Sequence, residues 1–272
     1  MKFVSKLLAC ILLVYSCHDS SPDEINEDGN LSDMNTEIKV LSYNIHHSNP
    51  PSQSDIINLN AIADVLKQSK ADVVGLQEVD VYTERSGKQL HMARSLAELA
   101  GFTYWYFSKS IDFQGGAYGT AILSKFPISD TLTLALPNPE NAEPRSLSLA
   151  TVHLNDSLKL RFGNTHLDYT NETNNLDQVK AIRNHLSQND ISTILTGDFN
   201  VVPSSASMEF IFEEFTSTCK NQCAFTSPSN SPSKTIDYIL YAGKGLRSIN
   251  HQVLLEPFPS DHLPVLSRLL FY

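Results

Sequence analysis

The segment "STILTGDFNVVP", Ser192 to Pro203, places polar residues directly behind an apolar run. The run from Ile191 to Leu195 predicts a buried strand. At the exit of this strand stand Asp198 and Asn200, a carboxylate and an amide. Because an isolated carboxylate is expensive to bury, the pattern indicates that Asp198 has a partner, such as a metal ion or hydrogen-bond donors.

Further apolar runs are followed or interrupted by polar residues in the same way. Each of these residues has an ordinary explanation on its own, as a turn residue, a solvated strand end or a buried sheet histidine. Together, such strand ends favour a single site, because strand termini and loops converge at the edges of sheets. The residues concerned are Asn44, Glu78, His166 with Asp168, Asp237, and Asp261 with His262.

The residue types in this set point to a chemistry. Oxygen donors without cysteine favour a hard cation such as Mg²⁺ or Mn²⁺. Histidines can transfer protons or clamp charge near neutral pH. A metal, a carboxylate that activates water and a histidine that steadies developing charge fit the hydrolysis of a phosphate ester.

The rest of the chain alternates helices with groups of strands. Ser54 is expected to cap the first helix, and Gly101 to end the second. Strands outnumber helices, which predicts a pair of mixed sheets flanked by helices. Helices are predicted over 54–69, 88–101, 172–187 and 205–215; strands over 38–45, 71–79, 103–109, 119–125, 130–136, 146–154, 159–167, 192–198, 234–240, 249–255 and 264–270.

The first residues resemble an export signal rather than part of the fold. Basic Lys2 and Lys6 precede the apolar "LLACILLVYS", which is too short to span a bilayer. The small Ser16 before Cys17 resembles the lipobox of bacterial lipoproteins; an ordinary secretory signal is the alternative. We therefore expect a signal peptide over 1–16, a lipidated flexible tether over 17–36, and a folded domain over 37–272 in the bacterial cell envelope.

Cysteine use agrees with export. Cys10 would be removed and Cys17 would carry lipid, which leaves Cys219 and Cys223 in "CKNQC". An oxidising compartment favours a disulfide between them. Metal binding is the weaker alternative, because no further Cys or His stands nearby at zinc-site spacing.

Six ordered motifs resemble the endonuclease/exonuclease/phosphatase superfamily: "LSYNIH", "GLQEVD", "NTHLD", "TGDFN", "TIDYIL" and "SDHLP". The resemblance runs from about Lys39 to Arg268. It implies a four-layer α/β sandwich with two facing mixed β-sheets flanked by helices. It also implies a Mg²⁺-dependent phosphoric ester hydrolase, with Mn²⁺ as the alternative ion.

The resemblance also implies residue roles around the metal and the attacking water. Glu78 would be the principal metal ligand, with Asn44 beside it on metal or phosphate. Asp261 would assist the metal or its network. Asp198 would orient or deprotonate the water, and Asn200 would hold that water or a phosphate oxygen.

For the histidines, the implied roles concern the phosphate. Asp237 would fix the ring of His262, which would contact the scissile phosphate as a clamp or an acid/base. His166 would bind the phosphate or protonate the leaving oxygen.

An exported bacterial subset of the family resembles the chain further, through "TERSGKQ", "FQGGAYGTAILSKFPI" and "EPRSLSLATV". Arg85 and Arg145 are then candidate phosphate contacts, because a guanidinium matches phosphate in a bidentate way. The alternative for both is a surface ion pair. The glycines of "GGAYG" favour a structural turn over a phosphate cradle.

Composition limits the choice of substrate only in part. The 272 residues carry a net charge of −10, so we expect no large basic face for nucleic acid. The net charge does not exclude a local basic cleft. The leading hypothesis is hydrolysis of a phosphodiester at the envelope, on a phospholipid head group, a small phosphodiester or nucleic acid. The alternatives are a non-specific endonuclease of the same fold and a non-catalytic phosphate-binding lipoprotein. No obligate protein partner is predicted.

Overall fold

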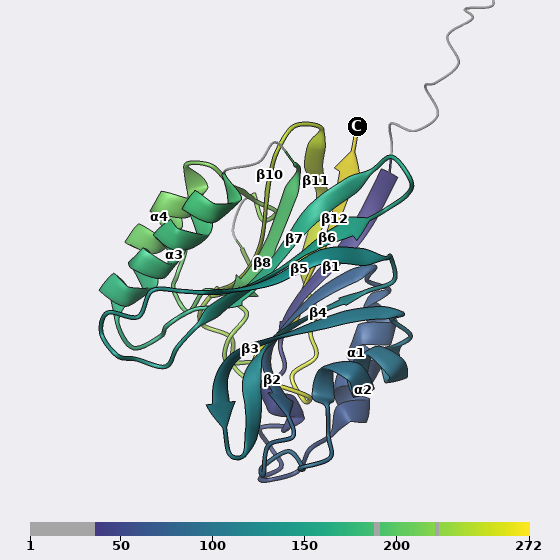
Figure 1. Ribbon diagram of the computed structural model, residues 1–272, viewed down its shortest axis with the longest axis vertical. Helices are drawn as coiled ribbons and strands as arrows, with labels where there is room; N and C mark the ends of the chain where they lie inside the picture. Colours follow the sequence, from purple (N-terminus) through teal and green to yellow (C-terminus); the bar gives the residue numbers. More distant parts are fainter. Residues whose placement is uncertain (1–35, 188–190, 221–222) are drawn as a thin grey trace, which may run out of the picture. The chain divides into compact units, whose positions relative to one another are not determined.

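The computed structural model describes residues 36–187, 191–220 and 223–272 (Figure 1). These residues belong to one structural unit. The predicted signal peptide, the predicted lipid anchor at Cys17 and the predicted tether up to residue 35 lie outside the described residues. No helix among the described residues is long and apolar enough to cross a membrane.

Two six-stranded sheets form the centre of the molecule. In each sheet one strand pair is parallel, β1 with β2 and β7 with β8, and the other pairs are antiparallel. The first sheet has the order β11 (Leu246–Val253), β12 (Val265–Phe271), β1 (Thr36–Asn44), β2 (Val73–Val81), β4 (Gly116–Ser124), β3 (Tyr104–Phe113). The second has the order β5 (Ile128–Ala135), β6 (Ser146–His153), β7 (Lys159–His166), β8 (Thr193–Asp198), β10 (Asp237–Ala242), β9 (Thr216–Ser217).

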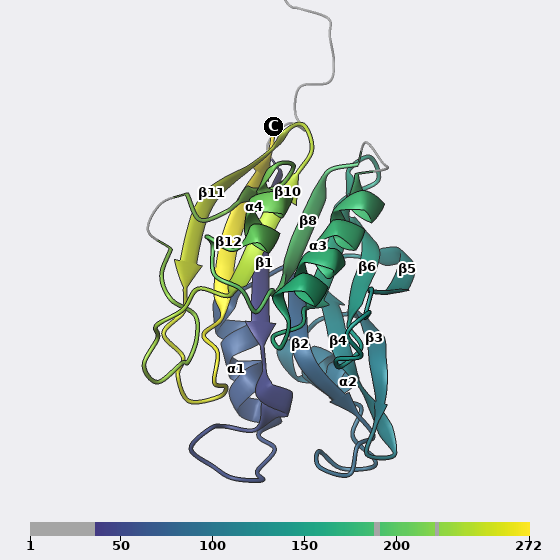
Figure 2. The same cartoon turned by 90° about the vertical axis from the view of Figure 1, so that its left-hand side faces the viewer.

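The sheets face each other across an apolar core, with helices on both outer faces. Val40 and Val73 of the first sheet share this core with Phe162 and Ile194 of the second. The helices α1 (Leu59–Ser69) and α2 (Met92–Ala100) cover the first sheet, and α3 (Glu172–Leu186) and α4 (Ala206–Phe212) cover the second. Figure 1 shows the two helical layers on opposite sides, and Figure 2 is turned so that α3 and α4 face the viewer. The predicted four-layer α/β sandwich is confirmed.

The predicted helix starting at Ser54 begins later in the structure. Asn58 caps α1 by accepting a hydrogen bond from the backbone of Ala61. The Ser54 hydroxyl is bonded to Asp55 instead, and the side chain of Asn49 holds the preceding segment as a loop. The cap at Ser54 was therefore wrong, because the hydrogen bonds of Asn49 hold the segment around Ser54 in a loop and leave the capping position to Asn58. Gly101 ends α2 in a left-handed conformation, as predicted.

A buried polar network connects the two sheets near the centre of their facing surfaces. The side-chain amide of Gln77 in β2 donates to Asn164 Oδ1 in β7 over 2.6 Å. Asn164 in turn donates to the backbone oxygens of Leu76 and Ala121 at 2.8 and 3.0 Å, and Thr196 in β8 donates to Asn164 Oδ1 at 3.1 Å. These directional bonds fix how the sheets are placed relative to each other, which apolar contact alone does not do.

The absence of a side chain at Gly75 leaves room for Thr196 and Asn164 of this network. A substitution at Gly75 therefore tests the sheet packing. A Cβ at this position would lie 2.1 Å from Thr196 Oγ1 and 2.6 Å from Asn164 Oδ1. We expect Gly75→Ala to lower the free energy of unfolding by about 1–3 kcal/mol, the usual range for overpacking. Urea unfolding measures this. In a Thr196→Ala background the loss should be smaller; an equal loss in both backgrounds would contradict the packing described.

Candidate active site

Polar side chains from both sheets meet at one edge of the sandwich. Asn44 is the last residue of β1, and Glu78 lies near the end of the neighbouring parallel strand β2. In the second sheet, His166 ends β7, Asp198 ends β8 and Asp237 begins β10, and these three lie in register across the strands. His262 comes from the loop before β12. The strand ends that carry polar residues in the sequence are thus brought together in space.

Asn44 joins the two halves of the site. Its amide nitrogen donates to Glu78 Oε1 and to Asp198 Oδ2, both at 3.0 Å. Its amide oxygen accepts from the backbone N–H of His46 at 3.1 Å. Ser260 donates to the Asn44 backbone oxygen over 2.7 Å and accepts from the backbone of His262, so the loop before β12 is fixed to the same residue. Asn44 therefore presents nitrogen, not oxygen, to Glu78.

Asp198 lies at the centre of the site. Its Oδ2 is 3.7 Å from the Nε2 atoms of both His166 and His262, and its Oδ1 accepts from the backbone of Asn200 at 2.9 Å. Only 1% of the residue is exposed. Burial and the nearby Asp237 carboxylate raise the pKa of Asp198 to about 7. A carboxyl that ionises near neutral pH is suited to act as a general base.

His262 is held by Asp237. Its Nδ1 lies 2.9 and 3.1 Å from the two carboxylate oxygens, which can only accept, so Nδ1 donates and Nε2 faces Asp198. Burial opposes protonation of this ring, but the carboxylates of Asp237 and Asp198 outweigh it and raise the pKa of His262 well above its ordinary value. His262 is accordingly an imidazolium at neutral pH, with one N–H directed into the site.

His166 has the opposite character. Arg145 Nη1 donates to His166 Nδ1 over 3.3 Å, so the ring proton is on Nε2, which faces Asp198. Burial, with the charges of Arg145 and His262 added, holds the pKa of His166 well below its ordinary value. The two histidines that flank Asp198 therefore differ: one is a cation and the other is a neutral N–H donor.

The two arginines predicted to contact phosphate are both in ion pairs. Arg145 is only 5% exposed and pairs with Glu143 at 2.9 Å behind His166. Arg85 binds Asp80 in a bidentate manner, at 2.7 Å from Nε and 3.0 Å from Nη2. Asp80 is fully buried, so this pair is more than a surface contact. The sequence motif "GLQEVD" contains Asp80 but gave no reason to pair it with Arg85.

The remaining predicted residues shape the loops. Asn200 has a left-handed backbone and donates its side-chain amide to the backbone of Leu167 over 2.9 Å. Asp168 accepts from Asn174 and Thr170, which organises the loop between β7 and α3. Asp261 lies close enough to Glu78 to act on its charge.

Glu78 occupies an irregular position in its strand. Gln77 and Glu78 together oppose the single residue Thr120 of β4, which makes a bulge, and Glu78 has a positive φ of 60°. Burial raises the pKa of Glu78, the hydrogen bond from Asn44 opposes this, and Asp261 raises it further. A carboxylate crowded by another acid in this way favours a nearby cation. The bulge thus aims Glu78 into the site.

Two groups of side chains among the described residues have metal-ligand spacing. One is Asp198, Asp237 and His262; the other is Glu78 with His46 and His47. Carboxylate and imidazole donors fit a divalent cation, so the site is chemically compatible with one. The sequence analysis did not propose His46 and His47 as ligands, although only Ile45 separates them from Asn44.

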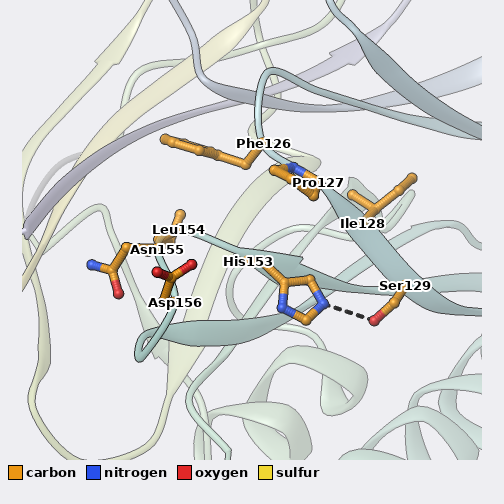
Figure 3. A pocket seen from close by; sticks show the side chains of 8 residues that line it. All are labelled: Phe126, Pro127, Ile128, Ser129, His153, Leu154, Asn155 and Asp156. Atoms are coloured by element: carbon orange, nitrogen blue, oxygen red, sulfur yellow. Dashed lines mark hydrogen bonds between the residues drawn. The ribbon is translucent and has the colours of Figure 1, made fainter.

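Two pockets help to delimit the site. One of about 230 Å³ adjoins Asn200 and is lined in part by Tyr169 and Lys234. Another, of about 580 Å³, surrounds His153 (Figure 3). His153 pairs with Lys159 at the start of β7, whereas His166 ends that strand, so the second pocket is at the opposite end of the sheet. Its contact between His153 and Ser129, 2.8 Å long, is remote from Asp198.

The cysteines predicted to pair, Cys219 and Cys223, are joined by a disulfide in the structure, with Cα atoms 5.7 Å apart. The bridge follows β9 and lines a pocket together with Phe212 and Tyr238. Among the described residues it is thus a feature of the α4–β10 connection, not of the strand-end site.

The fold and the site together define a four-layer sandwich with a carboxylate–imidazole centre at one edge. The chain belongs to the Endonuclease/Exonuclease/phosphatase family, whose sequence profile matches residues 41–262. The activities in the family's name, those of nucleases and phosphatases, are hydrolyses of phosphate esters. No curated protein matches the chain in sequence.

Solved structures with the same fold share little sequence with this chain. An endonuclease/exonuclease/phosphatase from Beutenbergia cavernae is 22% identical, with a TM-score of 0.74 over 86% of this chain and 72% of its own. A family protein from Bacteroides thetaiotaomicron is 19% identical, with a TM-score of 0.74 over 88% and 96%. A mannosyl-6-phosphatase of the same organism is 19% identical, with a TM-score of 0.72 over 86% and 100%. At these identities the comparison shows the fold alone.

Proposed function

We propose that the protein hydrolyses a phosphodiester with the help of a divalent cation, by attack of an activated water on phosphorus. The observation that carries this proposal is the position of Asp198, buried between a cationic and a neutral imidazole and hydrogen-bonded to Asn44. A general base with a pKa near neutrality beside two N–H donors is what such an attack requires.

The residues of the site then divide the tasks of catalysis. Asp198 takes the proton of the attacking water. His262, with its ring fixed by Asp237, directs Nε2–H toward a phosphoryl oxygen and offsets the charge that develops there. His166 offers its Nε2–H to the phosphate or to the leaving oxygen. Asn200 holds the attacking water or a phosphate oxygen.

Glu78 is the proposed ligand of the cation, with Asp261 and Asn44 near it. When bound, a divalent cation would offset the negative charge of the phosphoryl oxygens. The family resemblance implies Mg²⁺, with Mn²⁺ as the alternative. For Asn44 to ligate the ion through oxygen, its amide would have to turn away from the arrangement seen here.

Substrate and location form the finer part of the proposal. The "VYSC" segment supports lipid attachment at Cys17, which would place the enzyme in the bacterial envelope near phospholipid head groups. Arg85 and Arg145 stand as candidate phosphate contacts. The pocket lined by Tyr169 and Lys234 could receive the part of a substrate beyond the phosphate. Because one structural neighbour is a mannosyl-6-phosphatase, sugar phosphates belong in any substrate panel.

Metal removal tests the proposal. With bis-p-nitrophenyl phosphate as substrate, we expect turnover in the presence of a divalent cation and its loss in EDTA, because Glu78 and its neighbours need the ion to offset phosphate charge. Adding the cation back should restore the rate. Turnover that survives EDTA would contradict the metal requirement, and no turnover with any of several metals would favour the binding-protein alternative. An Asp198→Asn preparation controls for contaminating hydrolases.

A further inference from the structure

The segment that follows β1 brings two histidines against Glu78. Ligand atoms of His46, His47 and Glu78 lie within 4.8 Å of one another. Donor atoms bound to one ion at about 2.1 Å can be separated by at most about 4.2 Å, so a small adjustment closes the group around an ion. We infer that His46 and His47 ligate the cation at Glu78, and that this site selects a first-row transition-metal ion such as Zn²⁺ or Co²⁺ over Mg²⁺. This inference deepens the proposed function and rests on the same site.

The hydrogen bond of His46 leaves one nitrogen free for a metal. Its Nδ1 is 2.8 Å from the backbone oxygen of Asn49. A carbonyl oxygen only accepts, so Nδ1 carries the proton and Nε2 keeps its lone pair. Metal-binding histidines are commonly oriented by such a bond from the second nitrogen.

His47 carries an unsatisfied buried nitrogen. Within the part of the chain that the structure describes, His47 Nδ1 is buried and has no hydrogen-bond partner. Leaving a buried polar atom unpaired is destabilising, and a bond to a metal ion would remove that penalty. The unpaired nitrogen thus supports metal binding independently of the spacing of the three side chains.

The backbone around the two histidines adopts an uncommon conformation that presents them. His46, His47 and Ser48 have φ values of 44°, 41° and 60°, three consecutive non-glycine residues in the left-handed region. The conformation is held by the bond from the His46 backbone to Asn44 and by the bond from Asn58 to the Ser48 oxygen. Strained backbone of this kind concentrates at functional sites.

The surrounding groups explain why nitrogen ligands are needed here. Asn44, the other side chain bonded to Glu78, turns its amide nitrogen toward the carboxylate, so it offers no oxygen to a cation. In the alternative cluster at Asp198, Asp237 already accepts from His262 Nδ1 over 2.9 Å, and a cation at Glu78 leaves this bond intact.

The donor set determines the choice of metal. Two imidazoles with one carboxylate suit Zn²⁺, Co²⁺, Fe²⁺ or Ni²⁺, whereas Mg²⁺ prefers oxygen and keeps its waters. Three protein ligands leave coordination positions open, as in catalytic metal sites. In the absence of metal, the T-shaped contact of the two rings, with centroids 4.6 Å apart, keeps them together.

Metal binding without substrate tests the inference. Protein freed of metal with EDTA is titrated with Co²⁺, followed by its visible absorption, and Zn²⁺ and Mg²⁺ affinities are measured by calorimetry. We expect tight Zn²⁺ binding, weak Mg²⁺ binding and a Co²⁺ spectrum of a site with nitrogen ligands. His46→Gln and His47→Asn should each weaken Zn²⁺ binding by about tenfold or more. Loss of a residue that only orients a metal ligand already lowers metal affinity by about 10–100-fold.

The controls separate this inference from the proposed hydrolysis. His153→Asn, at the other end of the sheet, should bind Zn²⁺ like the parent. Glu78→Gln should lose binding, and urea midpoints without metal verify that each variant folds. Unchanged Zn²⁺ affinity in both histidine variants, or Mg²⁺ binding as tight as that of Zn²⁺, would overturn the inference. Intact Zn²⁺ binding with no turnover on any phosphate ester would instead remove the proposed function and leave the metal site.

Discussion

Replacement of Asp198 by asparagine is expected to lower turnover by about 10²–10⁴-fold, the range for loss of one acid/base group. The amide has the shape of the carboxyl, so the bond accepted from Asn44 can persist. What disappears is the proton acceptor, together with the negative charge between the imidazoles of His166 and His262. The change should therefore appear in kcat more than in KM.

The measurement is steady-state hydrolysis of bis-p-nitrophenyl phosphate, with urea unfolding as the check on folding. Asp168→Asn is the matched control, because Asp168 is another buried carboxylate at the same sheet edge whose oxygens are occupied by Asn174 and Thr170. We expect it to alter stability more than kcat. If Asp198→Asn kept most of its activity, Asp198 could not be the base.

Replacement of Asp237 by asparagine is expected to have a comparable effect, acting through His262. Asp237 accepts from His262 Nδ1, whereas an asparagine at this position could turn its amide and donate to that nitrogen. The ring would then present the wrong tautomer to the site. The charge of Asp237 also raises the pKa of His262, so its removal lowers that pKa.

The pH–rate profile distinguishes this coupling from a loss of structure. Activity that needs the imidazolium declines as the pH rises through the pKa of His262, so in Asp237→Asn the decline should occur at lower pH than in the parent. In a His262→Asn background, the Asp237→Asn change should have little further effect. A profile and rate equal to those of the parent would show that Asp237 does not act through this ring.

The layers of the fold were predictable because the pattern of apolar and polar residues that determines helices and strands is local in sequence. Apolar runs with polar ends determine strands, and amphipathic stripes determine helices, so two mixed sheets with helices outside followed from the sequence. The strand-end positions of Asn44, Asp198 and Asp237 also predicted that these side chains would meet. The roles assigned to them are still predictions.

Other features depend on side-chain geometry, which no apolar pattern encodes. The Arg85–Asp80 pair and the left-handed turn at His46 are held by hydrogen bonds to nearby residues, and the bulge that turns Glu78 arises from the pairing of β2 with β4. Likewise, burial with Arg145 beside it lowers the pKa of His166, whereas the carboxylates of Asp237 and Asp198 outweigh burial and raise the pKa of His262. Sequence order gives the members of this site but not their partners.

The pairing of the first and last strands has a consequence for how the protein is made. β12 pairs with β1 over Thr36–Ser42 and Val265–Phe271, and the loop just before β12 carries His262. A growing chain therefore has Glu78 and Asp198 long before it has this histidine. The centre is completed only when the final strand docks beside the first, so a chain released early by the ribosome would be catalytically incompetent even where its sheets had begun to form.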